Sequence, residues 1–198
     1  MFLLSGTIVL FIIIGICGKL SLNRNNSANK KLVGLLYLVA LFSCLLDLFT
    51  KFLAEKFLYS KTIEILGNFL YLKLAYNDGA AFSLLKGRAW VFSVIAIVMI
   101  ICIVNISKKV KSIYWALPLG IMLGGVVGNL CDRLFRPEYY GQGHVVDFIG
   151  YGDFFIGNLA DIFIVLSIVF VVLLEIFDVP FASDEKMGNN HDNVDKNL

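Results

Sequence analysis

Charged residues are scarce in this sequence. Asp, Glu, Lys and Arg together make up 16% of its 198 residues, whereas they make up about 25% of an average soluble protein. Hydrophobic residues make up 59% of the chain, and its mean hydropathy is +0.82. This balance excludes an ordinary soluble enzyme and indicates a membrane protein. A net charge of only +2 gives no reason to expect a nucleic-acid partner.

Residues that commonly bind metals or form nucleophilic triads lack the spacing that such sites need. The chain has two histidines, and no serine lies in a motif that would support a Ser/His/Asp arrangement around His144. The cysteines have no metal-like spacing, and all lie within or at the end of apolar runs: Cys17, Cys44, Cys102 and Cys131. We therefore interpret them as small packing residues and expect neither a metal nor a cofactor.

Long hydrophobic runs are what the sequence has instead. Five of them, of at least about 18 residues each, are long enough to cross a bilayer as helices: 2–20, 32–53, 89–106, 113–131 and 158–177. The first run lacks a basic start and a small-residue cleavage pattern, so an uncleaved helix is favoured over a signal peptide. The polar tail 178–198 is predicted to be disordered.

Two short linkers, 19–31 and 108–111, carry several basic residues and no acidic one. Short loops rich in Lys and Arg stay in the cytoplasm. Two crossings separate these linkers, as they must if both lie on the same side. The loops 54–88 and 132–157 are then external, and the carboxyl terminus is cytoplasmic.

The first external loop contains a predicted strand. Residues 69–76 are rich in strand-forming side chains, and Asn77-Asp-Gly follows them as a turn signal. We expect a small sheet on the outer membrane face.

Two carboxylates, Asp147 and Asp161, flank the start of the last apolar run. A carboxylate near hydrocarbon costs about 2.5–3.5 kcal/mol even on lenient insertion scales, and such residues usually have a function. Their position predicts chemistry that depends on a carboxyl pair.

Other polar residues are expected to join this pair at the external ends of the spans. Asp47 and Lys51 are four positions apart, so they share a helix face and can pair. Glycines recur every four residues from 120 to 128 and allow close helix packing. This packing would bring Asn129 of the fourth span near Asp161.

Structural interpretations of the same residues remain open. Asp47 and Lys51 could form an ion pair near the membrane interface without facing a substrate. Arg133 could extend to lipid phosphates, and Asp161 alone could be a buried carboxyl bonded to Asn or Arg. Because several polar residues fall near both aspartates, a functional pair is the favoured interpretation.

Five segments together form a specific pattern. They are Asp-Leu-Phe-Thr-Lys at 47–51, Asn-Asp-Gly-Ala-Ala-Phe-Ser at 77–83, Gly-Gly-Val-Val-Gly-Asn-Leu-Cys-Asp-Arg at 124–133, Val-Val-Asp-Phe-Ile at 145–149 and Asn-Leu-Ala-Asp at 158–161. In order and spacing, these segments resemble the motifs of lipoprotein signal peptidase (signal peptidase II). The resemblance covers roughly residues 32–177.

The resemblance implies an aspartic endopeptidase of the bacterial cytoplasmic membrane, with its active site at the extracytoplasmic face. Members of this family remove the signal peptide from prolipoproteins, cutting just before a cysteine that carries diacylglyceryl. The implied partners are therefore diacylglyceryl-modified prolipoproteins and membrane lipid, and we expect a monomer. By motif, Asp147 and Asp161 correspond to the catalytic pair. Positions that shape the site or hold substrate are Asp47, Lys51, Asn77, Gly79, Asn129, Arg133 and Asn158.

The fold expected from this resemblance is a mainly α-helical transmembrane bundle with a small extracytoplasmic β-sheet. Residues 32–177 form the peptidase domain with four family spans. Residues 1–31 add an extra span and a basic linker, which depart from the family pattern. Gly157, Ile162 and Asp78 also depart from it, but none of these replaces a catalytic group.

Two functions of other classes compete with the peptidase. A proton-coupled transporter component would use its intramembrane carboxylates as a relay, but Glu175 is the only candidate in the inner halves of the spans. A scaffold without activity would tolerate asparagine at both aspartate positions.

Overall fold

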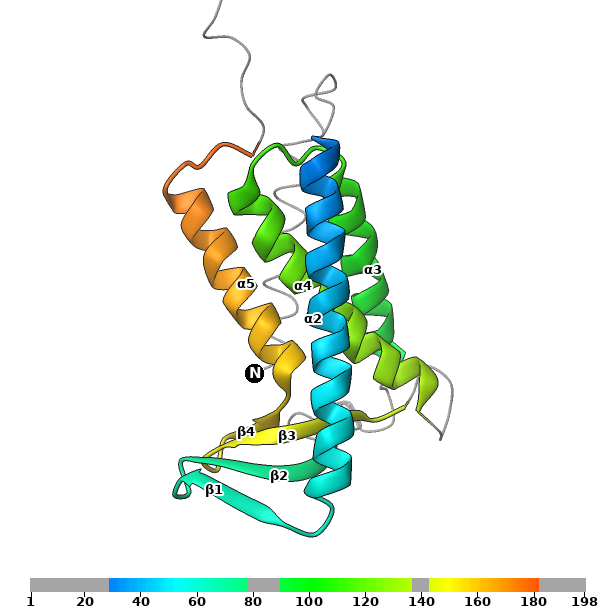
Figure 1. Cartoon of the computed structure of the whole chain (residues 1–198), viewed down its shortest axis with the longest axis vertical. Helices are drawn as coiled ribbons and strands as arrows, with labels where there is room; N and C mark the ends of the chain where they lie inside the picture. Colours follow the sequence, from blue (N-terminus) through cyan, green and yellow to red (C-terminus); the bar gives the residue numbers. More distant parts are fainter. Residues whose placement is uncertain (1–28, 78–89, 137–142, 182–198) are drawn as a thin grey trace, which may run out of the picture.

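The computed structural model describes residues 29–77, 90–136 and 143–181, which form four helices and one small sheet (Figure 1). The helices are α2 (Lys30–Phe57), α3 (Trp90–Ser107), α4 (Ile113–Phe135) and α5 (Leu159–Ile176). The strands are β1 (Thr62–Leu66), β2 (Leu70–Asn77), β3 (Val145–Tyr151) and β4 (Phe155–Gly157). The predicted first span, Asp78, Gly79 and residues 182–198 of the predicted tail lie outside the described residues.

All four helices are long and apolar enough to cross a membrane. The predicted fold class, a mainly α-helical membrane bundle with a small sheet, is therefore confirmed, and the chain is a multi-pass membrane protein. Two helices are longer than predicted, because hydropathy detects the lipid-spanning part of a helix and not its polar ends. Helix α2 continues through 54–57, and α4 continues to Phe135, so that Arg133 lies in its last turn.

Helix α4 is the centre of the bundle. It packs against α2, α3 and α5, and more of it is buried than of any other described helix. Helix α5 leaves large apolar side chains exposed, among them Leu166 and Phe170. Exposed side chains of this kind are expected where a helix faces lipid rather than water.

Glycines let α4 approach two neighbours closely. A Cβ added at Gly120 would lie 2.7 Å from the backbone oxygen of Leu36 in α2. A Cβ added at Gly124 would lie 2.5 Å from the backbone oxygen of Ala40 in the same helix. At Gly125 it would lie 2.8 Å from the Ala160 oxygen of α5. The predicted glycine stripe thus packs against α2. Contact with α5 depends on Gly125, which lies on another face of α4.

We expect Gly124→Ala to lower the free energy of unfolding by about 1–3 kcal/mol, because the new methyl group would overlap fixed backbone and the Ser43 side chain. Gly34→Ala is the matched control, since nothing lies within 4 Å of a Cβ there. That variant should be neutral or more stable by up to about 1 kcal/mol, because alanine favours helix. Thermal unfolding of both purified variants in one detergent measures the difference, and equal melting temperatures would contradict this packing.

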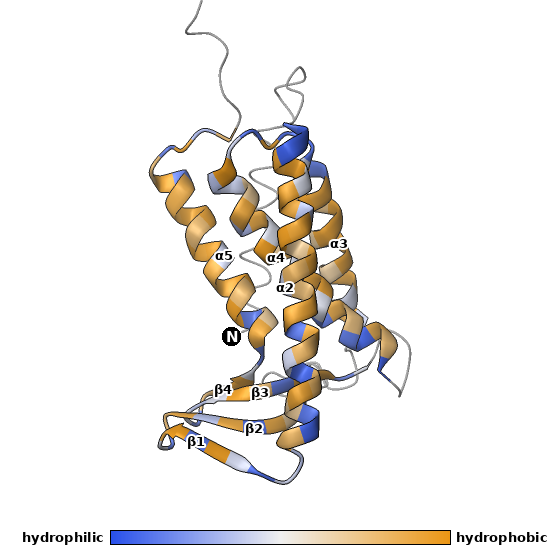
Figure 2. Cartoon of the chain, viewed as in Figure 1, coloured by the Kyte–Doolittle hydropathy of each residue, from blue (hydrophilic) through white to orange (hydrophobic). Residues whose placement is uncertain are grey.

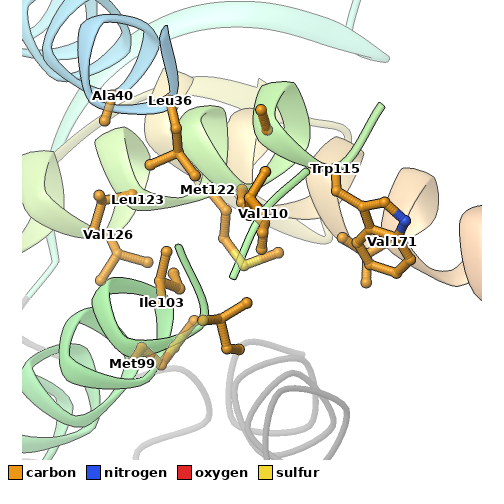
Figure 3. Close-up of a cluster of buried hydrophobic side chains, with 13 residues drawn as sticks. Leu36, Ala40, Met99, Ile103, Val110, Trp115, Met122, Leu123, Val126 and Val171 are labelled. Carbon is orange, nitrogen blue, oxygen red and sulfur yellow. The ribbon is translucent and has the colours of Figure 1, made fainter. Parts of the chain in front are cut away.

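The apolar core lies between the helices (Figure 3). Trp115, Met122 and Ile103 are almost completely buried in it. The Trp115 indole donates a hydrogen bond to the Val179 oxygen at 3.0 Å. The centres of the Trp115 and Phe181 rings lie 5.2 Å apart in a T-shaped arrangement. Ordered chain therefore extends past the predicted tail boundary at 177, because this short segment carries apolar side chains that cover the core.

The sheet lies at one end of the bundle (Figure 1). Its four strands are antiparallel in the order β1-β2-β3-β4. Strand β2 corresponds to the strand predicted at 69–76. In the β2–β3 register, Ala75 pairs with Asp147 and Asn77 pairs with Val145. This pairing places Asp147 and the end of β2 beside the helix ends.

Candidate functional site

Buried polar side chains gather where the bundle meets the sheet. In Figure 2, hydrophilic positions interrupt the otherwise hydrophobic ribbons of α2, α4 and α5 near this end. The buried residues of the cluster, each at most 8% exposed, are Asp47, Lys51, Asp132, Arg133, Asp147 and Asn158. All but Asp132 are among the predicted site residues.

Asp147 lies on β3, and both of its carboxylate oxygens accept hydrogen bonds from side-chain amides. Asn158 Nδ2 donates to Oδ1 at 2.6 Å, and Asn77 Nδ2 donates to Oδ2 at 2.8 Å. The side chain is 2% exposed. Asn77 ends the adjacent strand β2, so strand pairing brings its amide to Asp147.

Asp161 lies in the first turn of α5. Its Oδ2 accepts the Asn158 backbone N–H at 3.0 Å, and its Oδ1 accepts Asn129 Nδ2 at 3.0 Å. The Asp161 backbone N–H in turn donates to Asn158 Oδ1 at 3.0 Å. This reciprocal capping box begins the helix and restricts the Asp161 carboxylate to one orientation. The predicted approach of Asn129 to Asp161 is confirmed.

A single residue, Asn158, contacts both aspartates. Its side-chain amide nitrogen donates to Asp147, while its side-chain oxygen and backbone nitrogen bind the backbone and carboxylate of Asp161. The residue is 1% exposed. Asn158 therefore holds the two carboxyl groups beside each other, although they come from a strand and a helix.

Burial raises the pKa of Asp147 from 3.8 to about 6, and the hydrogen bonds from Asn77 and Asn158 offset part of this rise. Desolvation disfavours the charged form of a carboxyl group, while donors favour it. A carboxyl group at this position therefore keeps its proton to a higher pH than an ordinary aspartate does. Such a carboxyl group can donate or accept a proton near neutral pH.

Lys51 is completely buried and makes three polar contacts. Its Nζ lies 2.7 Å from Asp47 Oδ2 and 2.9 Å from Asp132 Oδ2, and it donates to Asn129 Oδ1 at 2.8 Å. The predicted pairing of Asp47 with Lys51 is confirmed. Because neither side chain has exposed surface, this geometry favours a site-shaping role over direct contact with substrate.

The network reaches both aspartates. Asn129 accepts from Lys51 and donates to Asp161. Asp47 Oδ1 accepts the Ala160 backbone N–H at 2.9 Å, in the first turn of α5. The charges on α2 therefore hold both the side chain of Asp161 and the start of its helix.

Asp132 is a site residue that the sequence analysis did not assign. Its Oδ2 accepts the Val146 backbone N–H at 3.2 Å, next to Asp147 in β3. Three positions separate it from Asn129, so both lie on one face of α4. That spacing could have identified Asp132 as a candidate for the same site.

The structure places Arg133 and His144 near aromatic rings. The Arg133 guanidinium lies 5.1 Å from the centre of the Phe92 ring, within the range of a cation–π interaction. Gly79 lies outside the described residues. His144 precedes strand β3, and its ring centre lies 6.2 Å from that of Tyr76.

Comparison with known proteins gives consistent matches. The family described as signal peptidase (SPase) II matches residues 39–177. A lipoprotein signal peptidase of Mycobacterium leprae is 42% identical over 137 residues, which cover 69% of this chain and 68% of that protein. The lipoprotein signal peptidase of Mycobacterium tuberculosis strain H37Rv is 36% identical over 168 residues, which cover 84% of this chain and 82% of that protein.

Solved structures agree with the fold. A bacterial membrane enzyme determined at 2.3 Å resolution superposes with a TM-score of 0.64 at 25% identity, covering 77% of this chain and 94% of that one. A second bacterial membrane enzyme, determined at 1.9 Å resolution, superposes with a TM-score of 0.65 at 24% identity. That superposition covers 79% of this chain and 99% of the other. The arrangement of helices and sheet is thus shared with these enzymes.

Proposed function

Because the chain belongs to the signal peptidase II family, we propose that it is an aspartic endopeptidase whose catalytic residues are Asp147 and Asp161. It cleaves the signal peptide from diacylglyceryl-modified prolipoproteins, just before the lipidated cysteine. The observation that carries this proposal is the contact of Asn158 with both carboxyl-bearing residues, at 2.6 Å to Asp147 and 3.0 Å to Asp161.

Two adjacent carboxyl groups can supply both proton transfers that peptide hydrolysis needs. Like charges in close proximity disfavour double ionisation, so such a pair holds one shared proton. The ionised carboxyl takes a proton from a water molecule as it attacks the scissile carbonyl carbon. The protonated carboxyl donates its proton to the carbonyl oxygen, which gives a tetrahedral gem-diol. The carboxyl that took the proton from water then donates it to the leaving nitrogen as the C–N bond breaks, and the other carboxyl takes back a proton from a gem-diol hydroxyl. The proton belongs to the pair and not to one residue.

The surrounding amides have a defined part in this mechanism. Asn158 and Asn77 orient Asp147, while Asn129 orients Asp161. Preorganised donors of this kind need little rearrangement during the reaction. The mechanism requires neither a metal nor a cofactor.

We place the site at the extracytoplasmic face of the bacterial cytoplasmic membrane. The basic residues Lys108, Lys109 and Lys111 lie between α3 and α4, at the end of the bundle away from the sheet (Figure 1). Short basic loops remain cytoplasmic, so the carboxyl pair would lie on the outside. The protein would act as a monomer on substrates held by the same membrane.

Location near the bilayer explains selection of a lipidated substrate. Each buried methylene of an acyl chain contributes about 0.8 kcal/mol to membrane binding. A diacylglyceryl group therefore holds the adjacent peptide bond at membrane depth, near Asp147 and Asp161.

A cleavage assay with two matched precursors tests the proposal. The purified protein should cut a diacylglyceryl-modified precursor before its cysteine, leave the unmodified precursor uncut and keep its activity in the presence of a chelator. Mass spectrometry of the products identifies the cleaved bond. Equal cleavage of both precursors, or loss of activity with the chelator, would contradict the proposed specificity or mechanism.

A further inference from the structure

A chain of charged residues leads from the buried site to the protein surface. Asp132 contacts Lys51 with Oδ2 and Arg136 Nε with Oδ1, each at 2.9 Å. The Arg136 Nη1 group also pairs with Glu55 Oε1. Exposure increases along this chain, from 3% at Asp132 to 24% at Arg136 and 29% at Glu55.

This chain joins the helix ends to the sheet. Glu55 lies in the last turn of α2, and Arg136 is the residue at which α4 ends. The Tyr76 hydroxyl lies 3.5 Å from Glu55 Oε1, at the limit of a hydrogen bond. In the sheet, Tyr76 pairs with Val146, the residue before Asp147. The ion pair thus lies where α2, α4 and the strand that carries Asp147 meet.

Arg136 adds a positive charge beside the buried acid Asp132. Asp47 and Asp132 share one ammonium group, that of Lys51. The guanidinium of Arg136 brings a further positive charge into direct contact with Asp132. It also occupies Asp132 Oδ1, which leaves Oδ2 in position to bind Lys51 and the Val146 N–H.

We propose that Arg136, oriented by Glu55, is a positioning residue for the carboxyl pair. Arg136 fixes the position of Asp132. Asp132 in turn binds the β3 backbone next to Asp147, and it binds Lys51, whose contact with Asn129 leads to Asp161. This inference rests on the proposed catalytic role of those two aspartates. Arg136 itself acts through Asp132 and not through contact with substrate.

Steady-state cleavage of the lipidated precursor by Arg136→Gln tests this role. We expect kcat to fall about tenfold while KM changes less than twofold, since a small displacement of catalytic groups slows the chemical step. Arg136→Lys should be intermediate, because lysine keeps the charge but cannot bind two carboxylates with a planar fork. An unchanged kcat in Arg136→Gln, or a loss confined to KM, would overturn the proposal.

A double-variant cycle tests whether Glu55 acts through Arg136. Glu55→Gln should lower kcat about threefold, and the Glu55→Gln/Arg136→Gln variant should be no slower than Arg136→Gln alone. Additive losses would overturn the assigned role of Glu55. Lys56→Gln and Glu64→Gln are matched controls, since both residues are exposed charges near the sheet. Equal losses in these controls would show a general effect of surface charge and overturn the proposal.

Two further results separate this inference from the proposed function. If Asp147→Asn is inactive but Arg136→Gln is as fast as the wild type, only the positioning role fails. If Asp147→Asn is fully active, the proposed function itself fails. If Arg136→Gln does not fold, Arg136→Lys and Glu55→Gln still decide the question, because each should retain wild-type KM with a reduced kcat.

Discussion

Replacing Asp147 or Asp161 by asparagine should lower the rate of precursor cleavage by a factor on the order of 10³–10⁴. Asparagine keeps the size of the side chain but cannot exchange a proton near neutral pH. Loss of either member leaves the pair unable to activate water and protonate the leaving group in one cycle. The variant with both substitutions should be no slower than either single variant, because the two groups act as a unit.

Initial rates with one lipidated precursor, at equal amounts of folded protein, measure this effect. Asp153→Asn is the control: Asp153 is exposed in the turn between β3 and β4, and its substitution should leave the rate unchanged. A melting temperature near that of the wild type would show that each catalytic variant is folded. A variant at either aspartate that keeps more than a tenth of the wild-type rate would remove that residue from the catalytic pair.

The second large effect is expected at Lys51, and it concerns stability. Lys51→Met should lower the free energy of unfolding by about 3–5 kcal/mol, because it removes a buried charge from two buried acids. Asp47 and Asp132 would lose the ammonium group that now lies 2.7 and 2.9 Å away. Denaturant unfolding in detergent, compared with the wild type, measures the loss.

A compensating variant makes this prediction specific. Lys51→Met with Asp47→Asn also removes one of the acids, and the remaining acid, Asp132, keeps its contact with Arg136. Removing both partners of a buried pair costs less than removing one, so the double variant should be more stable than Lys51→Met alone. If Lys51→Met is as stable as the wild type, the buried network does not contribute to stability as described.

The helical part of the fold could be predicted from the sequence, because four long apolar runs are a strong signal. The sheet was predicted only in part. Strand β2 has many strand-forming residues, but β4 has three residues and β1 is wholly exposed. Short, exposed strands carry little local signal, and their pairing depends on contacts between distant segments. The register that pairs Ala75 with Asp147 could therefore not be read from the sequence.

Site residues on one helix were easier to predict than contacts between elements. The spacing of Asp47 and Lys51 directly indicated an ion pair, and the structure contains it. The role of Asn158 could not be derived from spacing, because its contact with Asp147 depends on how β3 meets the start of α5. Asp132 was missed for a similar reason: its partners Lys51 and Val146 come from α2 and β3.

A binding measurement with a peptide analogue tests the carboxyl pair most directly. Two lipidated analogues are compared. In the first, a hydroxyethylene group replaces the scissile amide and resembles the tetrahedral transition state. In the second, the replacement group is the same except that it lacks the hydroxyl. The hydroxyl analogue should bind at least about 100-fold more tightly, and most of this difference should disappear in both Asp147→Asn and Asp161→Asn. Equal affinity of the two analogues for the wild type, or a preference that both variants retain, would contradict catalysis by these two aspartates.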